Sequence, residues 1–239
     1  MKDGLLDWDC AEAVSVPDMA AALEHIRSEG TFPVGLLTNP QLSHRADHGC
    51  VRSPSLTSSS RQPSVDSKED QNSVGQCPAS DAKIQAIKAR VDAWLRPGQP
   101  GHRIFADGRL SLCLFDGFLL YCTEMRPVMD LIDVKLFLLV SRAKATQRRE
   151  ARDGYVTLEG FWKDPPGYVD KIVWPNYADA HAWLFRDGDV EGILDDAVLE
   201  GTGIRAQTGK GLDVDFEETF EWVVETVISE LEKQCLDDK

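Results

Sequence analysis

Hydrophobic residues recur every three or four positions in three segments of the chain, as they do on the buried face of a helix. These segments are 17–29, 81–95 and 216–231. Pro17 suits the first turn of a helix, because the N–H that proline lacks has no partner there, and Gly30 can end that helix. Asp213 or Asp215 can cap the start of the last segment. The pattern therefore predicts three amphipathic helices.

Two short segments are almost continuously apolar, which is typical of parallel strands covered by helices on both faces. They are 110–115, which runs into Asp116, and 134–140. Ser141 can cap a further helix that includes the arginine-rich stretch 147–153, and 197–199 is a third strand candidate. Strands that alternate with helices predict an α/β fold, in which a parallel sheet is flanked by helices.

The segment 38–81 has a different composition from its surroundings. It is rich in Ser, Pro, Gln, Asn and Asp and holds almost no aromatic residues. Such a segment cannot bury enough apolar area to offset the entropy lost on ordering it. We therefore predict a disordered insertion within a single domain that spans residues 1–239.

The charge balance narrows the functional classes. The 239 residues carry a net charge of −14, which argues against a general nucleic-acid binder. The longest apolar runs, near 112–122 and 136–140, are too short to cross a membrane, and no leader pattern opens the sequence. The six cysteines form no Cys-x-x-Cys pair, which favours reduced thiols over a zinc site or disulfides. We expect a protein of the cytoplasm, with the nucleus as a second location.

Asp116 is a candidate ligand for Mg²⁺. It follows a predicted buried strand, and ligands of open α/β sheets bind at the carboxyl ends of strands. The alternative is an ordinary turn, because Asp followed by Gly is favourable turn chemistry. On this feature alone the turn is slightly favoured.

Arg148, Arg149 and Arg152 form a cationic cluster on a predicted helix of an acidic chain. Enzymes that transfer phosphoryl groups use Arg or Lys to stabilise the negative charge on the transferred group. The alternative, which is more common in general, is a solvated helix surface whose arginines pair with Glu150 and Asp153.

Aromatic and acidic residues mark two further candidates. The stretch 154–168 holds two prolines and four aromatic residues, so its rings either stack on a flat ligand or tie a loop to the core, and we weigh these equally. Asp7 and Asp9 flank Trp8, and carboxylates in such a place can accept hydrogen bonds from a ribose diol. The alternative is a pair of loop or capping acids.

The segment 203–211 resembles a phosphate-binding loop only superficially. Five residues instead of four separate its first two glycines, and Gly211 instead of Ser or Thr follows Lys210. We therefore interpret it as a flexible loop.

Several of these stretches occur together, and in the same order, in a known family. They are 3–9, 115–120, the arginine cluster with Tyr155, 165–170 and 173–175. On these residues the chain resembles the nicotinamide riboside kinases, a branch of the uridine-kinase-like P-loop kinases, and looks most like the fungal members. The resemblance covers nearly all of the chain except 38–81.

The resemblance implies a kinase that moves the γ-phosphoryl group of ATP, with Mg²⁺, to the 5′-hydroxyl of nicotinamide riboside. It implies that Trp8 and Asp9 lie at the nucleoside and that Tyr155 and Asp164 face the nicotinamide ring. It also implies roles in phosphoryl transfer and ATP binding, with Arg149 and Arg152 in a lid over the phosphates, Arg148 at the cofactor, Asp116 at the metal, and Gly201 and Thr202 near the adenine.

The chain also departs from the family pattern. Residues 1–239 hold neither the opening strand with its Gly-x-x-x-x-Gly-Lys-Ser/Thr loop nor the Asp-Asp-Phe segment that follows it in the family. Without them we expect a parallel sheet that is incomplete at its N-terminus and a weak hold on the phosphates, hence little kinase activity. Two alternatives stay open: a non-catalytic nucleoside-binding or regulatory protein, and a kinase for another ribonucleoside such as uridine.

Overall fold

A computed structural model describes residues 5–33, 77–106, 108, 110–117, 119–152, 154–157 and 160–237. Residues 38–76 of the predicted insertion lie outside the described residues, so their disorder stays a prediction. The predicted boundary at 81 is too late, because Ala79 is buried and Ser80 caps a helix that begins at Asp81.

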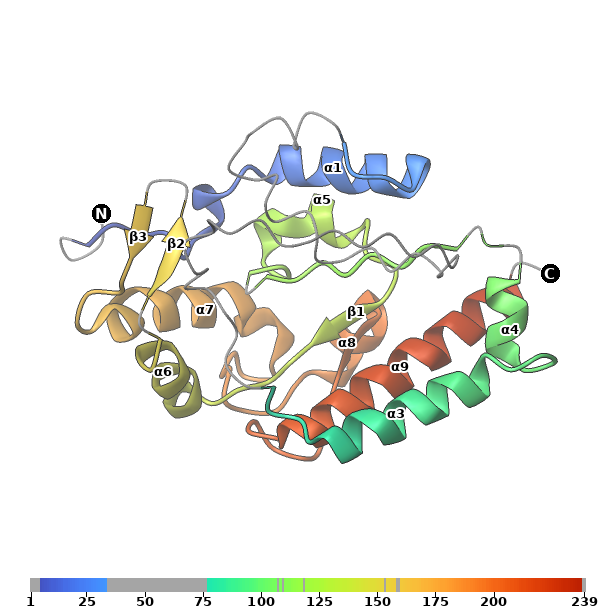
Figure 1. The fold of residues 1–239 in the computed structure, drawn as a ribbon. Helices are drawn as coiled ribbons and strands as arrows, with labels where there is room; N and C mark the ends of the chain where they lie inside the picture. Colours follow the sequence, from blue (N-terminus) through green and yellow to red (C-terminus); the bar gives the residue numbers. More distant parts are fainter. Residues whose placement is uncertain are drawn as a thin grey trace, which may run out of the picture.

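A parallel pair of strands lies at the centre of the fold (Figure 1). β1 (Lys135–Phe137) pairs with β4 (Ile204–Ala206), with Lys135 opposite Ile204 and Phe137 opposite Ala206. The pair is surrounded by helices, so the fold is of the predicted α/β class. Within the described residues this sheet has two strands, fewer than the sequence pattern predicts.

Helices make up most of the described chain. Its α-helices are α1 (Val16–Glu29), α3 (Asp81–Trp94), α4 (Pro100–Phe105), α5 (Arg126–Met129), α6 (Arg142–Glu150), α7 (Trp174–His181), α8 (Asp196–Thr202) and α9 (Phe216–Asp237). Short 3-10 turns η1 (Ala11–Ala13), η2 (Thr123–Met125) and η4 (Ala182–Leu184) and the π-helical turn η3 (Val169–Val173) join them. In Figure 1, α1 lies along α5 and α3 lies along α9, while α4 packs against the end of α9. None of the described helices has an apolar stretch long enough to cross a lipid bilayer.

The capping residues explain where the predicted helices begin and end. The Ser15 hydroxyl accepts the backbone N–H of Asp18 at the start of α1, and Gly30 ends that helix with φ of 66°. The Ser141 hydroxyl accepts the N–H of Lys144 and so starts α6. At α9 the cap is Asp215, whose carboxylate accepts the N–H of Glu217. Asp213, the other candidate, instead accepts the N–H and hydroxyl of Ser141.

Three predictions of local structure are wrong. The segment 110–115 is no regular strand, because the described residues give it only a single bridge position, at Cys113, and Leu114 is 82% exposed. The candidate strand 197–199 lies in α8, because the Asp195 carboxylate caps a helix by accepting the N–H groups of Ala197 and Val198. The predicted flexible loop 203–211 contains β4.

The aromatic stretch 154–168 also differs from the predicted loop. Its first part is an antiparallel hairpin of β2 (Tyr155–Thr157) and β3 (Gly160–Trp162), with Tyr155 opposite Trp162. The hairpin leads through a Pro-Pro-Gly turn into η3 and α7. The hairpin therefore places residues 163–168 beside the end of α6.

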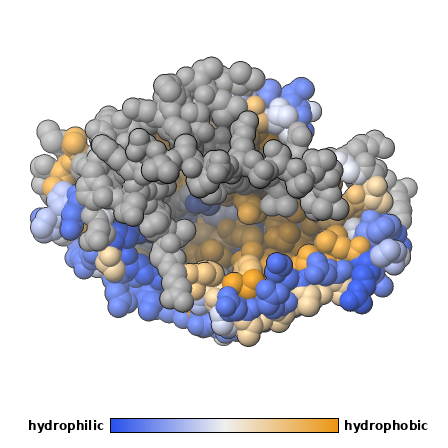
Figure 2. Space-filling view, in the orientation of Figure 1, coloured by the Kyte–Doolittle hydropathy of each residue, from blue (hydrophilic) through white to orange (hydrophobic). Residues whose placement is uncertain are grey.

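The core lies between the sheet and the helices beside it. Its fully buried side chains include Leu184, Ile204 and His181, and Phe137 of β1 packs among them. Hydrophobic residues also reach the surface in a hollowed area of the face shown in Figure 2. Exposed leucines of the described chain include Leu112, Leu114 and Leu138.

Candidate functional site

A buried ion pair joins the N-terminal segment to the end of α6. Asp9 is only 4% exposed, and its carboxylate receives two hydrogen bonds from Arg149. Nη1 lies 2.7 Å from Oδ1 and Nη2 lies 3.0 Å from Oδ2. Such a two-point contact fixes the orientation of both groups, because the planar guanidinium matches the planar carboxylate.

The same guanidinium holds a second carboxylate. Nε of Arg149 donates to Oδ2 of Asp164 at 2.6 Å, and Nη2 lies 3.4 Å from Oδ1 of that residue. Burial alone would lower the pKa of Arg149, but its hydrogen bonds to Asp164 and Asp9 and their charges outweigh burial, so the pKa is raised above its ordinary value. Arg149 is therefore a permanent cation between two carboxylates.

Tyr168 ties the turn after the hairpin to the same network. Its side chain is buried, its hydroxyl accepts the backbone N–H of Trp8 at 3.1 Å, and its ring centre lies 5.7 Å from Cζ of Arg149. Burial, and then the neighbouring charge of Asp9, raise the pKa of the phenol, so it stays protonated. For Tyr168, the role of tying a loop to the core is the correct one of the two interpretations.

Asp7 and Asn176 complete the network. The amide nitrogen of Asn176, on α7, lies 2.9 Å from each carboxylate oxygen of Asp7 and 2.9 Å from the carbonyl oxygen of Asp9. Oδ1 of Asp7 also accepts the backbone N–H of Asp9 at 3.1 Å. Nothing in the sequence marks Asn176 as a site residue, since a single Asn early in a helix belongs to no recognisable pattern.

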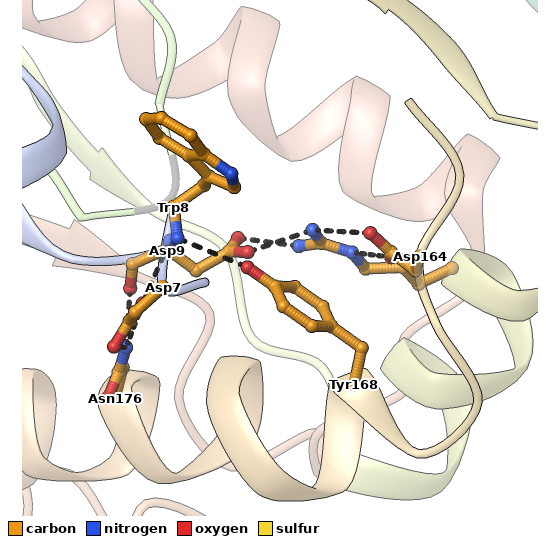
Figure 3. A network of polar contacts seen from close by, with 7 residues as sticks. Asp7, Trp8, Asp9, Asp164, Tyr168 and Asn176 are labelled. Atoms are coloured by element: carbon orange, nitrogen blue, oxygen red, sulfur yellow. Dashed lines mark hydrogen bonds and ion pairs between the residues drawn. The ribbon is translucent and has the colours of Figure 1, made fainter. Parts of the chain in front are cut away.

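The indole of Trp8 points away from the ion pairs (Figure 3). It is 44% exposed, although the residue after it is buried. The segment therefore holds a carboxylate inside the protein and a flat aromatic ring at the surface, one residue apart.

A pocket of about 230 Å³ lies against this network. It is bounded by the end of α6 and by the turn 163–169, and its charged lining residues are Arg149, Glu150, Arg152, Lys163 and Asp164. Three of these five are cations, so the pocket can accept a negatively charged group beside the acids of the network.

The structure brings four of the predicted site residues together: Trp8, Asp9, Arg149 and Asp164. A fifth, Arg152, is exposed and lines the adjoining pocket. Tyr155 lies in β2, but its side chain is outside the described residues.

The other predicted site residues show no contact with this network in the described structure. Asp116 and Arg148 are exposed. Gly201 and Thr202 lie in the last turn of α8, where the Thr202 hydroxyl donates to the Val198 carbonyl at 2.7 Å. Their roles stay predictions.

The residues that the structure describes hold no group of three or more His, Cys, Asp or Glu side chains that could bind a metal. Asp116 is an exposed carboxylate outside any such group. Mg²⁺ is commonly bound through one or two carboxylates together with substrate phosphates, and Asp116 fits the protein part of such a site.

Comparison with known proteins supports the family resemblance. The chain is 26% identical over 232 residues to the nicotinamide riboside kinase of Schizosaccharomyces pombe, which covers 97% of the chain and 79% of that relative. It is 29% identical over 188 residues to the nicotinamide riboside kinase of Eremothecium gossypii, covering 79% of the chain and 60% of the relative. With nicotinamide riboside kinase 2 of Mus musculus it shares 35% identity over 127 residues, 51% of the chain and 60% of the relative.

No family model matches the chain, and no solved structure matches it. The curated relatives are all named as kinases, which supports a nucleoside kinase class for the chain. More narrowly, the chain is similar to the nicotinamide riboside kinases, as the resemblance of its motifs indicates. The parallel pair of strands with its covering helices is consistent with the α/β fold of P-loop kinases.

Proposed function

We propose that this chain binds nicotinamide riboside and phosphorylates its 5′-hydroxyl with ATP, giving nicotinamide mononucleotide for NAD synthesis. The observation that carries the proposal is the junction at Arg149, which joins Asp9 to Asp164 one residue from the exposed ring of Trp8. The names of the relatives support the same substrate.

The chemistry of this junction suits a ribose that carries a cationic ring. A carboxylate has about four lone-pair sites, so Asp9 can keep Arg149 and still accept hydrogen bonds from a diol. Trp8 offers a flat face for stacking. Around the network and the pocket, four carboxylates (Asp7, Asp9, Glu150 and Asp164) face three cations (Arg149, Arg152 and Lys163). This small excess of negative charge would favour a pyridinium ring over the neutral ring of uridine.

The arginines at the end of α6 and just after it would supply the positive charge for phosphoryl transfer. Arg149 and Arg152 both line the pocket beside the network, where cations would stabilise the charge that spreads over the transferred group. Exposed Arg148 would contact ATP, and Gly201 and Thr202 would lie near its adenine. Asp116 would hold Mg²⁺ directly or through water, and the bound ion would neutralise phosphate charge.

Binding and turnover are separate parts of this proposal. Residues 1–239 contain no Gly-x-x-x-x-Gly-Lys-Ser/Thr motif, so the cradle of backbone N–H groups that this motif forms around phosphates is not encoded in them. We therefore propose that the polypeptide 1–239 binds the nucleoside but transfers the phosphoryl group slowly by itself. Fast turnover would contradict this second part alone.

The test is calorimetric titration of the purified chain with nicotinamide riboside and, separately, with uridine. We expect nicotinamide riboside to bind at least tenfold more tightly, and Asp9→Ala to abolish its binding. Asp179→Ala removes an exposed carboxylate on α7 and serves as the matched control. Equal affinity for uridine would favour the alternative of a kinase for other ribonucleosides. Product formation with ATP and Mg²⁺, followed by chromatography, then separates a kinase from a binding protein.

A further inference from the structure

The side chain of Asn176 holds the backbone on which the candidate site is built. Its neighbours Asp7 Oδ1, Asp7 Oδ2 and the Asp9 carbonyl oxygen are all hydrogen-bond acceptors, each 2.9 Å away. Only the NH₂ group of the amide can face three acceptors, so the chemistry fixes the orientation of this side chain.

Residues 7–9 lie in neither a helix nor a strand, so no regular backbone ladder holds them. The N–H of Asp9 is bound by Asp7, the carbonyl of Asp9 by Asn176, and the N–H of Trp8 by the hydroxyl of Tyr168. Side chains thus satisfy three neighbouring backbone groups. Two of these side chains lie at least 160 residues away in the sequence.

Asn176 and Asp7 lie on the other side of the segment from the indole of Trp8 (Figure 3). A ligand that stacks on this indole and bonds to the carboxylate of Asp9 therefore has no contact with Asn176. Loss of the Asn176 amide would instead leave the carbonyl of Asp9 and the carboxylate of Asp7 without this hydrogen-bond donor. The orientations of the Trp8 and Asp9 side chains would then become less defined.

We propose that Asn176 and Asp7 are positioning residues, which orient Trp8 and Asp9 for the ribonucleoside without touching it. This inference rests on the proposed function. Part of the affinity for the nucleoside would thus depend on the neutral amide of Asn176 on α7. An Asp at position 176 would set a carboxylate against both the carboxylate of Asp7 and the carbonyl of Asp9, which is repulsive.

The test compares Asn176→Ala and Asn176→Asp with wild type by calorimetric titration with nicotinamide riboside. We expect Asn176→Ala to raise the Kd about tenfold, since hydrogen bonds to charged groups are worth enough to change affinity by that factor. Asn176→Asp should raise it further, and Asp7→Asn added to Asn176→Asp should restore part of the loss. Where turnover is measurable, KM for the nucleoside should rise while kcat and the KM for ATP stay within twofold. Asp179→Ala, an exposed change on the same helix, should leave the Kd unchanged.

The outcomes separate the two proposals. If wild type does not bind nicotinamide riboside, the proposed function is wrong and the positioning role falls with it. If wild type binds and Asn176→Ala binds equally well, only the positioning role is wrong. Should Asn176→Ala fail to fold, Asp7→Asn tests the same contact, because it removes the charge of the partner carboxylate without changing the size of the side chain. An unchanged Kd for that variant overturns the inference.

Discussion

Arg149 reaches Asp9 across 140 residues of sequence with both of its terminal nitrogens, at 2.7 and 3.0 Å. The adjacent edge of the same guanidinium, formed by Nε and Nη2, holds Asp164, 15 residues further along the chain. One cation therefore connects the N-terminal segment, the end of α6 and the turn after the hairpin. The candidate site exists as a unit because of this side chain.

We expect Arg149→Lys to destabilise the protein and to weaken nucleoside binding more than tenfold. An ammonium group cannot bond to two carboxylates in the planar, two-point manner of a guanidinium, so a buried carboxylate loses part of its pairing. The free energy of unfolding, measured by urea denaturation, should fall by roughly 2 kcal/mol. Arg148→Lys changes the exposed neighbour in the same helix and should change neither quantity. Equal effects of the two substitutions would show that the junction at Arg149 has no special role.

Trp8 should affect binding more than stability. The residue is 44% exposed, so a little over half of its surface is covered, and Trp8→Ala should lower the melting temperature by only a few degrees. Stacking of an aromatic side chain on a base is worth about 1–3 kcal/mol, so the Kd for nicotinamide riboside should rise between about fivefold and a hundredfold. Trp8→Phe keeps a flat ring and should recover most of the affinity. A melting temperature that falls strongly in Trp8→Ala, with unchanged Kd, would assign the indole to packing.

Local chemistry in the sequence correctly predicts the end of α1 at Gly30 and the start of α6 after Ser141. Each of these residues acts on backbone groups only a few positions away, so its effect can be predicted from the local sequence. The strand prediction at 197–199 failed because three apolar residues fit a helix as well as a strand, and the capping acid before them decides between the two. The strand prediction at 110–115 failed because a strand needs a neighbouring strand to pair with, and the residues of the segment itself do not specify that neighbour.

The same distinction applies to the site. The sequence and its family resemblance indicate Trp8, Asp9, Arg149 and Asp164 one at a time, each with its own ligand group. That one guanidinium joins both carboxylates depends on the approach of three distant segments, which no local pattern contains. Asn176 was missed for the same reason, since its importance comes from the backbone that lies against it.

The cap of α8 gives a test of the corrected helix at 196–202. Oδ1 of Asp195 accepts the N–H groups of Ala197 at 2.9 Å and Val198 at 3.3 Å. Asp195→Ala should therefore lower the free energy of unfolding by about 1 kcal/mol, and Asp195→Asn or Asp195→Ser should restore most of it. Asp196→Ala removes only an exposed ion pair with Arg186 and should cost less than about 0.5 kcal/mol. Identical losses in Asp195→Ala and Asp196→Ala would argue against the cap.

His181 should make stability depend on pH between about 5.5 and 7.5. The imidazole is fully buried between Phe137 and Tyr177, with ring centres 5.4 and 4.6 Å away. Its Nδ1 lies 2.9 Å from the carbonyl oxygen of Tyr177, and its Nε2 has no hydrogen-bond partner among the described residues. Burial lowers the pKa of His181 below its ordinary value of 6.5, so the ring is neutral in the folded protein at neutral pH.

The sign of the effect follows from which state takes up the proton first. As the pH falls below 6.5, His181 takes up a proton in the unfolded chain but stays neutral in the folded chain, where its pKa is lower. The free energy of unfolding therefore falls until the pH reaches that lowered pKa. Between pH 7.5 and 5.5 the free energy of unfolding of wild type should fall by about 1 kcal/mol more than that of His181→Phe, as measured by urea denaturation at each pH. The buried phenylalanine keeps the ring stacking but cannot bind a proton. His102→Gln removes an exposed histidine from α4 and should retain the wild-type loss. If His181→Phe shows the same pH dependence as wild type, the imidazole is protonated in the folded core as readily as in the unfolded chain, and another group is responsible for the loss.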